Sequence, residues 1–128
     1  MSEPIVFISR FRIKPGRQAD FEKHYRESLP PIEAGKPDTL VQLAYVNEDQ
    51  TEVSVVRVFP SADGLDFQLQ GSNERSKKTY QFIEPLDFEI YGAPGSFAME
   101  MFKKVAGSGI PVNSLPIYLG GFIRLKSG

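Results

Sequence analysis

The sequence contains no cysteine, no tryptophan and only one histidine, His24, among its 128 residues. Without cysteine the chain has no disulfide framework, no thiolate nucleophile, no iron–sulfur cluster and no cysteine-ligated zinc. With one imidazole it also lacks the ligands for a multi-histidine metal site within one chain. Any chemistry must therefore use carboxylates, tyrosine, lysine, arginine, serine or His24, and we expect neither a metal nor a cofactor.

An excess of charge of one sign is also lacking, because 15 basic residues face 16 acidic ones and the formal net charge is −1. This balance offers little attraction to a phosphate backbone or an anionic membrane, so we expect no nucleic-acid or membrane partner. The N-terminal residues lack a secretory signal, and no apolar run approaches the length that spans a bilayer. We therefore expect a cytoplasmic protein.

The composition itself is that of one soluble domain. Hydrophobic residues make up 41% of the chain and charged residues 24%, and ten phenylalanines with five tyrosines supply large groups for a core. We expect a single domain over residues 1–128, with a core over about 5–91 and an extension over about 96–125.

Period-two alternation predicts a first strand over residues 5–14, with one face almost wholly apolar. A Pro-Gly pair at 15–16 ends this strand. Apolar residues at helical spacing follow and predict a helix that ends near Leu29, because Pro30 and Pro31 remove two amide donors.

Two β-branched and apolar runs, 40–46 and 53–59, are separated by a polar connection and predict an antiparallel hairpin. Ser61 occupies the N-cap position of a helical segment, a second helical piece is expected over about 73–83, and alternation over 86–91 predicts a fourth strand. The order is βαββαβ, the ferredoxin-like α+β arrangement in which two helices cover one face of a four-stranded antiparallel sheet.

The opposite face of this sheet is left uncovered. Because the first strand carries long side chains on both faces, we expect the uncovered face to pack against a second copy, which gives a homodimer. In the extension, Ser96 is expected to cap an amphipathic helix that ends at 107–109; an irregular stretch over 110–116 and a last strand over 117–125 follow. We expect the extension either to cap a cavity of its own chain or to add a strand to the partner's sheet.

Two segments carry a resemblance to a known family. Residues 7–16, a strand that ends in Lys-Pro-Gly, and residues 55–65, a strand that steps through Pro-Ser into a helix, are similar to the antibiotic biosynthesis monooxygenase family of dimeric α+β barrels. The resemblance covers about the first ninety residues. It implies a dimeric barrel of ferredoxin-like units that oxidises an electron-rich aromatic or quinol with O₂, without flavin or metal.

At the family's functional positions this chain departs from the pattern. The family commonly has Trp where Phe59 stands, and His where Gln68 and Asn73 stand. Gln68 and Asn73 are candidate substrate-binding residues, because an amide hydrogen-bonds a ligand although it transfers no proton at neutral pH. In the haem-degrading branch an Asn aligns with Ser9 and the iron-ligating His with about Lys78, whose protonated amine cannot replace imidazole, so we expect no haem.

The remaining candidates come from the residue pattern. His24, at the edge of the first helix's apolar stripe, is a candidate general base, or else an edge residue that packs its ring. Ser9, the one polar residue on the first strand's apolar face, marks a cavity or makes room for a helix. Arg57 orients an anionic substrate or forms a surface or interface ion pair. Tyr25 and Tyr80 offer phenols to a ligand or satisfy them structurally.

Three functions are compatible with these residues. The first is a cofactor-independent, monooxygenase-like enzyme that acts on a small aromatic or quinol-type metabolite. The second is a non-catalytic dimeric barrel that binds a small apolar ligand. The third is a cyclase or isomerase that uses His24 or a carboxylate as its base.

Overall fold

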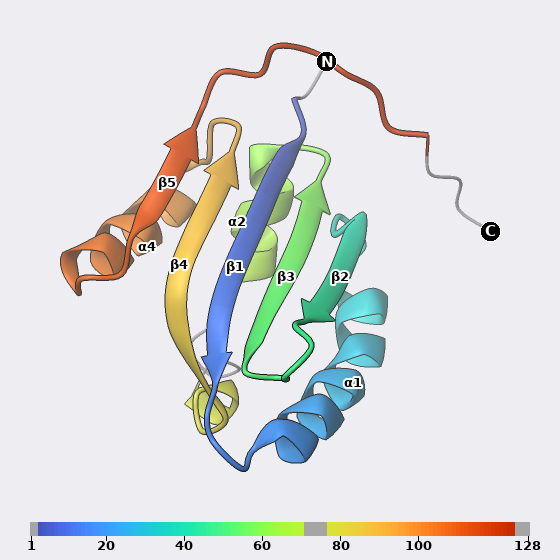
Figure 1. Cartoon of the computed structure of the whole chain (residues 1–128). Coiled ribbons are helices and arrows are strands. Elements are labelled where there is room, and N and C mark those ends of the chain that lie inside the picture. The colour runs from blue at the N-terminus through green and yellow to red at the C-terminus, as the bar shows by residue number, and fades with distance from the viewer. Residues whose placement is uncertain (1–2, 71–76, 125–128) are drawn as a thin grey trace.

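A computed structural model describes residues 3–70 and 77–124 of the chain (Figure 1). The elements in chain order are β1 (Ile5–Ile13), α1 (Gln18–Gly35), β2 (Val41–Val46), β3 (Glu52–Phe59), α2 (Ala62–Leu69), β4 (Ile83–Tyr91), α4 (Ser96–Gly107) and β5 (Val112–Leu115). The strands form one sheet in the order β2-β3-β1-β4-β5. The predicted βαββαβ order is confirmed, and β5 adds a fifth strand parallel to β4.

The central strand β1 fixes the two faces of the sheet. Its odd-numbered residues are buried on the face that the helices cover, as the alternation predicted. On this face Ser9 lies opposite Val55 of β3 and Phe88 of β4, and Phe7 lies opposite Arg57. The largest fully buried side chains include Phe59, Ile5, Leu65 and Ile90. The core therefore lies between the sheet and the helices, α2 being visible behind β1 and β3 in Figure 1.

The first helix is longer than predicted. We expected it to end near Leu29, but α1 runs to Gly35 with Pro30 and Pro31 inside it. Both prolines are exposed to solvent, so water can satisfy the carbonyls that lack an amide donor, and the last turn is closed by the amide of Lys36, which donates to Ile32 O at 2.8 Å. Each proline removes one amide donor, and the helix continues because Arg26 and Glu27, whose carbonyls lose those donors, are exposed to water.

The second helical piece ends earlier than expected. Residues 71–76 lie outside the described residues, residues 77–79 are helical, and β4 begins at Ile83, which we had placed at the end of the helix. Ile83 pairs with Ile13 at the end of β1 and is buried. Sheet pairing therefore overrides the helical spacing at this position.

The extension differs from the prediction in two details. Ser96 is the first residue of α4 and does not cap it; the N-cap is Gly95, and Asp66 of α2 accepts a hydrogen bond from the amide of Ala98 at 3.1 Å. The last strand is β5, within the stretch expected to be irregular, and residues 117–124 form no strand. Pro111 and Pro116 flank β5, which is compatible with a short strand at a sheet edge.

The sheet face opposite the helices, here called the open face, carries two rows of apolar side chains. In one row Val6 of β1 lies between Val58 of β3 and Tyr91 of β4. In the next row Ile8 lies between Val56 of β3 and Glu89 of β4, and Val56 lies opposite Leu43 of β2; Glu89 is paired with Arg10. No helix in the described ranges is long and apolar enough to cross a membrane.

Candidate functional site

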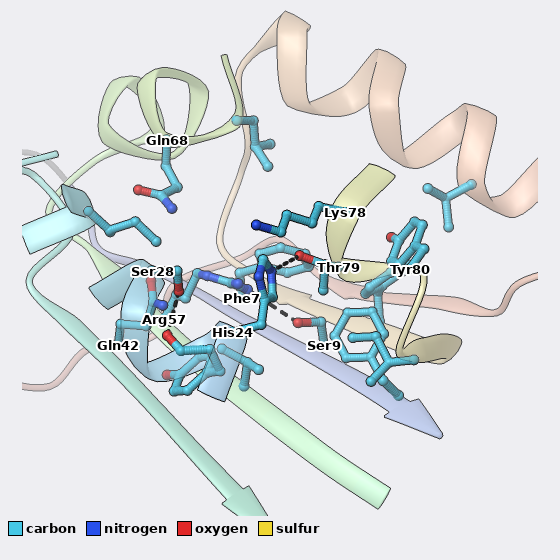
Figure 2. A pocket seen from close by; sticks show the side chains of 18 of the residues that line it. Phe7, Ser9, His24, Ser28, Gln42, Arg57, Gln68, Lys78, Thr79 and Tyr80 are labelled. Atoms are coloured by element: carbon cyan, nitrogen blue, oxygen red, sulfur yellow. Dashed lines mark hydrogen bonds between the residues drawn. The ribbon is translucent and has the colours of Figure 1, made fainter. Parts of the chain in front are cut away.

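A cavity of about 480 Å³ lies between the sheet and the helices α1, α2 and α4 (Figure 2). Much of its wall is aromatic. The centre of the Phe7 ring lies 5.8 Å from the centre of the Phe88 ring and 5.3 Å from that of Phe102. The ring centres of Phe11 and Phe88 are 5.9 Å apart. The helix α4 closes one side with Met101, Phe102 and Val105, so the extension caps the cavity of its own chain, one of the two roles we expected for it.

Six of the seven residues predicted for the site line this one cavity: Ser9, His24, Tyr25, Arg57, Gln68 and Tyr80. Asn73 lies outside the described residues. Phe59, at the family's Trp position, is fully buried and is not among the residues that line the cavity. Residues that are far apart in the sequence are thus brought together, whereas Phe59 belongs to the core.

His24 extends from α1 to the cavity and is partly buried. Its Nε2 lies 2.8 Å from Oγ1 of Thr79, and the centre of its ring lies 5.4 Å from the centre of the Phe82 ring. Burial lowers the pKa of His24 below its ordinary value of 6.5, the nearby ammonium of Lys78 lowers it further, and Glu27 opposes both effects. The imidazole is therefore predominantly neutral at pH 7, the form that accepts a proton.

Ser9 and Arg57 form a polar pair on the cavity floor. Arg57 Nη1 donates to Ser9 Oγ at 3.2 Å, and the guanidinium carbon lies 5.7 Å from the centre of the Phe7 ring. Ser9 is only 1% exposed, so its hydroxyl is held beneath the helices. Because Arg57 lines the cavity, its side chain lies on the helix-covered face of the sheet.

The two tyrosines and Gln68 form other parts of the wall. Tyr25 packs its ring 6.1 Å from that of Phe21, and Tyr80 lies 6.2 Å from Phe11 at the more exposed end. Gln68 is buried, and its Oε1 accepts a hydrogen bond from Thr39 Oγ1 at 2.7 Å. The carbonyl oxygen of Gln68, which stands at the family's His position, is therefore hydrogen-bonded within the protein.

Four polar residues of the cavity wall were not predicted from the sequence: Ser28, Gln42, Lys78 and Thr79. Gln42 of β2 lies opposite Arg57 in the sheet, and its Oε1 is buried with no hydrogen-bond partner among the described residues. Thr79 bonds His24, and Lys78 also lines the cavity, although its basic run had been interpreted as a solvated helix face. Strand register places Gln42, and the short helical segment 77–79 before β4 places Lys78 and Thr79; neither can be deduced from local alternation.

The chemistry open to this site is binding of an apolar molecule and transfer of a proton. The wall combines aromatic rings, one neutral imidazole and a few fixed polar groups, as small-molecule sites usually do. Among the described residues no group of three His, Cys, Asp or Glu is placed to hold a metal ion. The group able to take a proton near neutral pH is His24.

The sheet, its covering helices and the cavity beneath them define a ferredoxin-like α+β fold, that of the antibiotic biosynthesis monooxygenase structures. MupZ from Pseudomonas fluorescens superposes with a TM-score of 0.70 at 17% identity, over 96% of both chains. SnoaB, a cofactor-independent oxygenase from Streptomyces nogalater, superposes with a TM-score of 0.61 at 15% identity, over 74% of this chain and 97% of its own.

A structure from Bacteriodes thetaiotaomicron that carries the family's name superposes with a TM-score of 0.57 at 15% identity, over 69% of this chain and 85% of its own. A scan against protein-family models finds no match, and neither does a search of curated proteins. At these identities the likeness confirms the predicted fold, and it does not extend to an activity.

Proposed function

We propose that this protein is a cofactor-independent, monooxygenase-like enzyme that acts on a small aromatic or quinol-type metabolite bound in the cavity. The observation that carries the proposal is the neutral imidazole of His24 on the wall of a largely aromatic cavity. The fold shared with SnoaB, a cofactor-independent oxygenase, supports the same reading by analogy.

The first step is binding and orientation of the substrate. An aromatic ring packs against Phe7, Phe88 and Phe102, whose tilted and edge-on contacts leave ring faces and edges available to it. Burial of the substrate displaces water from the cavity, which strengthens the electrostatic interactions around His24.

The second step is proton transfer to His24, which leaves an electron-rich substrate anion. The anion supplies the electrons to O₂, so that one oxygen atom enters the substrate. For a reacting CH₂ group, the carbon becomes a carbonyl, the O–O bond breaks, and the two hydrogens leave with the second oxygen atom as water. The substrate is oxidised and O₂ is reduced, and the balance requires no further reductant. Thr79 fixes the imidazole by its 2.8 Å hydrogen bond.

Oxygen uptake tests the proposal directly. Wild type is mixed with a panel of quinols and polyphenols in an oxygen electrode, and His24→Gln is compared with it. We expect uptake above the uncatalysed rate with at least one compound, and loss of a factor of about 10²–10⁴ in His24→Gln, the usual contribution of a general base. Lys23→Gln, an exposed neighbour on α1, is the matched control and should keep wild-type activity.

Two results of this assay would replace the proposal. Tight binding without any uptake would favour the non-catalytic binding barrel. Conversion of a compound without uptake, dependent on His24, would favour the cyclase or isomerase, since the same base serves both types of reaction.

We also propose that the protein acts as a homodimer through its open face. The rows around Val6 and Ile8 leave apolar side chains facing solvent in a single chain. The C-terminal arm, residues 116–124, extends away from the sheet in Figure 1, with Ile117 86% exposed, Leu119 100% and Phe122 80%. A second copy placed face to face would cover the apolar rows and give the two arms a surface to cross onto.

Sedimentation velocity tests this assembly. We expect wild type to sediment as a dimer, and Ile8→Asp, which places a charge in the centre of the open face, to sediment as a monomer with its circular dichroism spectrum retained. Deletion of residues 116–128 should weaken the dimer. A wild-type monomer at 100 µM, well above assay concentrations, would refute the assembly.

A further inference from the structure

Among the described residues that line the cavity, the charged groups are all of one sign. Arg57 and Lys78 are cationic, and none of the described residues that line the cavity carries a carboxylate. An anion inside this largely apolar cavity is attracted by the two cations more strongly than it would be in water, because apolar surroundings screen charge less than water does.

Lys78 is the more accessible of the two cations. Its side chain is exposed, and among the described residues no carboxylate forms an ion pair with it. Figure 2 shows the side chain extending over His24 towards Gln68 and away from Tyr80. The ammonium is close enough to the imidazole for its charge to lower the pKa of His24, so the same charge reaches a molecule bound against His24.

Gln42 and Arg57 form a second polar part of the cavity wall. They lie directly opposite each other on β2 and β3, on the face covered by the helices. The Oε1 of Gln42 is buried with no hydrogen-bond partner among the described residues, and as an acceptor it suits a hydroxyl or N–H of the ligand and not its ionised oxygen. Polar groups therefore lie at Lys78 and at Arg57, whereas Phe11, Phe88 and Ile83 form apolar wall.

We infer that the cavity selects an organic anion, an aromatic or otherwise apolar body carrying one carboxylate or a comparably placed ionised oxygen. The inference rests on the proposed function, because it names the class of substrate for the same cavity. An anion is attracted by Lys78 and Arg57, whereas a neutral analogue gains no such attraction and a cationic one is repelled. The same charges stabilise the substrate anion that His24 forms.

Isothermal titration calorimetry with three probes of one shape tests the inference. The probes are 2-naphthoate, 2-naphthamide and 2-naphthylmethylammonium, which carry one negative charge, no charge and one positive charge at pH 7. We expect 2-naphthoate to bind about tenfold or more tightly than 2-naphthamide, as for one charge-assisted hydrogen bond, and the cation to bind weakest. Added salt should narrow the ratio of naphthoate to naphthamide affinity.

Lys78→Met separates charge from packing, because it keeps the length of an exposed side chain and removes only the ammonium. It should weaken 2-naphthoate about tenfold and leave 2-naphthamide unchanged. Lys77→Met, a neighbouring exposed lysine that is not part of the described cavity wall, is the matched control and should leave the affinities of both probes unchanged.

The outcomes distinguish this inference from the function on which it rests. If 2-naphthamide binds as tightly as 2-naphthoate in wild type, the anion preference is wrong and the cavity still binds aromatic molecules. If Lys77→Met and Lys78→Met lower naphthoate affinity equally, the preference reflects general surface charge and the assignment to Lys78 is wrong. If no probe binds at millimolar concentration, both the inference and the proposed ligand site fail.

Discussion

The carboxylate of Asp66 links two helices around the cavity. It extends from α2 and accepts the Ala98 amide of α4 at 3.1 Å, at the end of α4 where backbone N–H groups lack intrahelical partners. The N-cap residue itself, Gly95, has no side chain, and a Cβ added there would overlap the Asp66 carboxylate. Asp66→Ala should therefore loosen α4, which carries Met101 and Phe102 of the cavity wall.

The magnitude follows from the two roles of the carboxylate. Loss of a cap costs about 1 kcal/mol, and loss of a negative charge at the positive end of a helix dipole costs about 0.3–1 kcal/mol more. Unfolding entropy near 2.1 cal/mol/K per residue gives about 0.27 kcal/mol/K for a chain of 128 residues. A loss of about 1.3–2 kcal/mol therefore lowers the Tm by about 5–7 °C.

Thermal unfolding followed by circular dichroism measures this change, and calorimetry with 2-naphthoate measures its effect on the cavity. Asp66→Asn, which keeps the acceptor oxygen and loses the charge, should lie between wild type and Asp66→Ala. Gly95→Ala should also lower the Tm, because the added methyl displaces the carboxylate. Glu100→Ala, on the exposed side of α4, is the control. An Asp66→Ala Tm within 1 °C of wild type would refute the reasoning.

Two further predictions concern Ser9 and His24. Ser9→Leu adds bulk at a 1% exposed position on the cavity wall, so the affinity for 2-naphthoate should fall at least about tenfold, whereas Ser9→Ala should retain binding. Calorimetry measures both variants, and equal affinities would contradict the assignment of Ser9 to the cavity wall. Because the folded-state pKa of His24 lies below the unfolded value of 6.5, the unfolded chain binds more protons, and this contribution to stability declines as the pH falls below 6.5. Urea midpoints at pH 7 and pH 5 should therefore differ more for wild type than for His24→Gln, and identical differences would contradict the burial of His24.

Most of the fold follows from local sequence pattern. Alternation along β1 identifies its buried face, and the single polar residue on that face, Ser9, does lie at a cavity. His24 lies on the same cavity because helical spacing places it at the edge of the buried stripe of α1. These predictions succeeded because one face of each element is buried and the other is not.

The errors lie where tertiary contacts override local preference. Two prolines predicted the end of α1, yet Ile32 beyond them lines the cavity and the helix continues to Gly35. Helical spacing extended to Ile83, which instead pairs with β1. In each case packing or strand pairing, which depends on residues distant in sequence, decides the local structure.

The cavity's polar wall was only partly predictable. Gln42 faces the cavity because its register with Arg57 places the even-numbered residues of β2 on the helix-covered face. No sequence pattern indicates that Thr79 lines the cavity. Lys78 belongs to a basic run that is typical of a solvated helix face, yet in the structure its charge acts on His24. Register and turn geometry are set by the assembled sheet, so these residues needed the structure.

The ionisation of a bound phenol tests the central claim, that this cavity helps to form a substrate anion with His24 as the base. The absorbance of 2-naphthol, saturated with protein, is followed from pH 6 to pH 10, because naphthol and naphtholate have different spectra. We expect the bound naphthol to ionise at a lower pH than in water, and His24→Gln and Lys78→Met each to reverse part of that change. Bound naphthol that ionises at the same pH as in water, or at a higher one, would contradict the account.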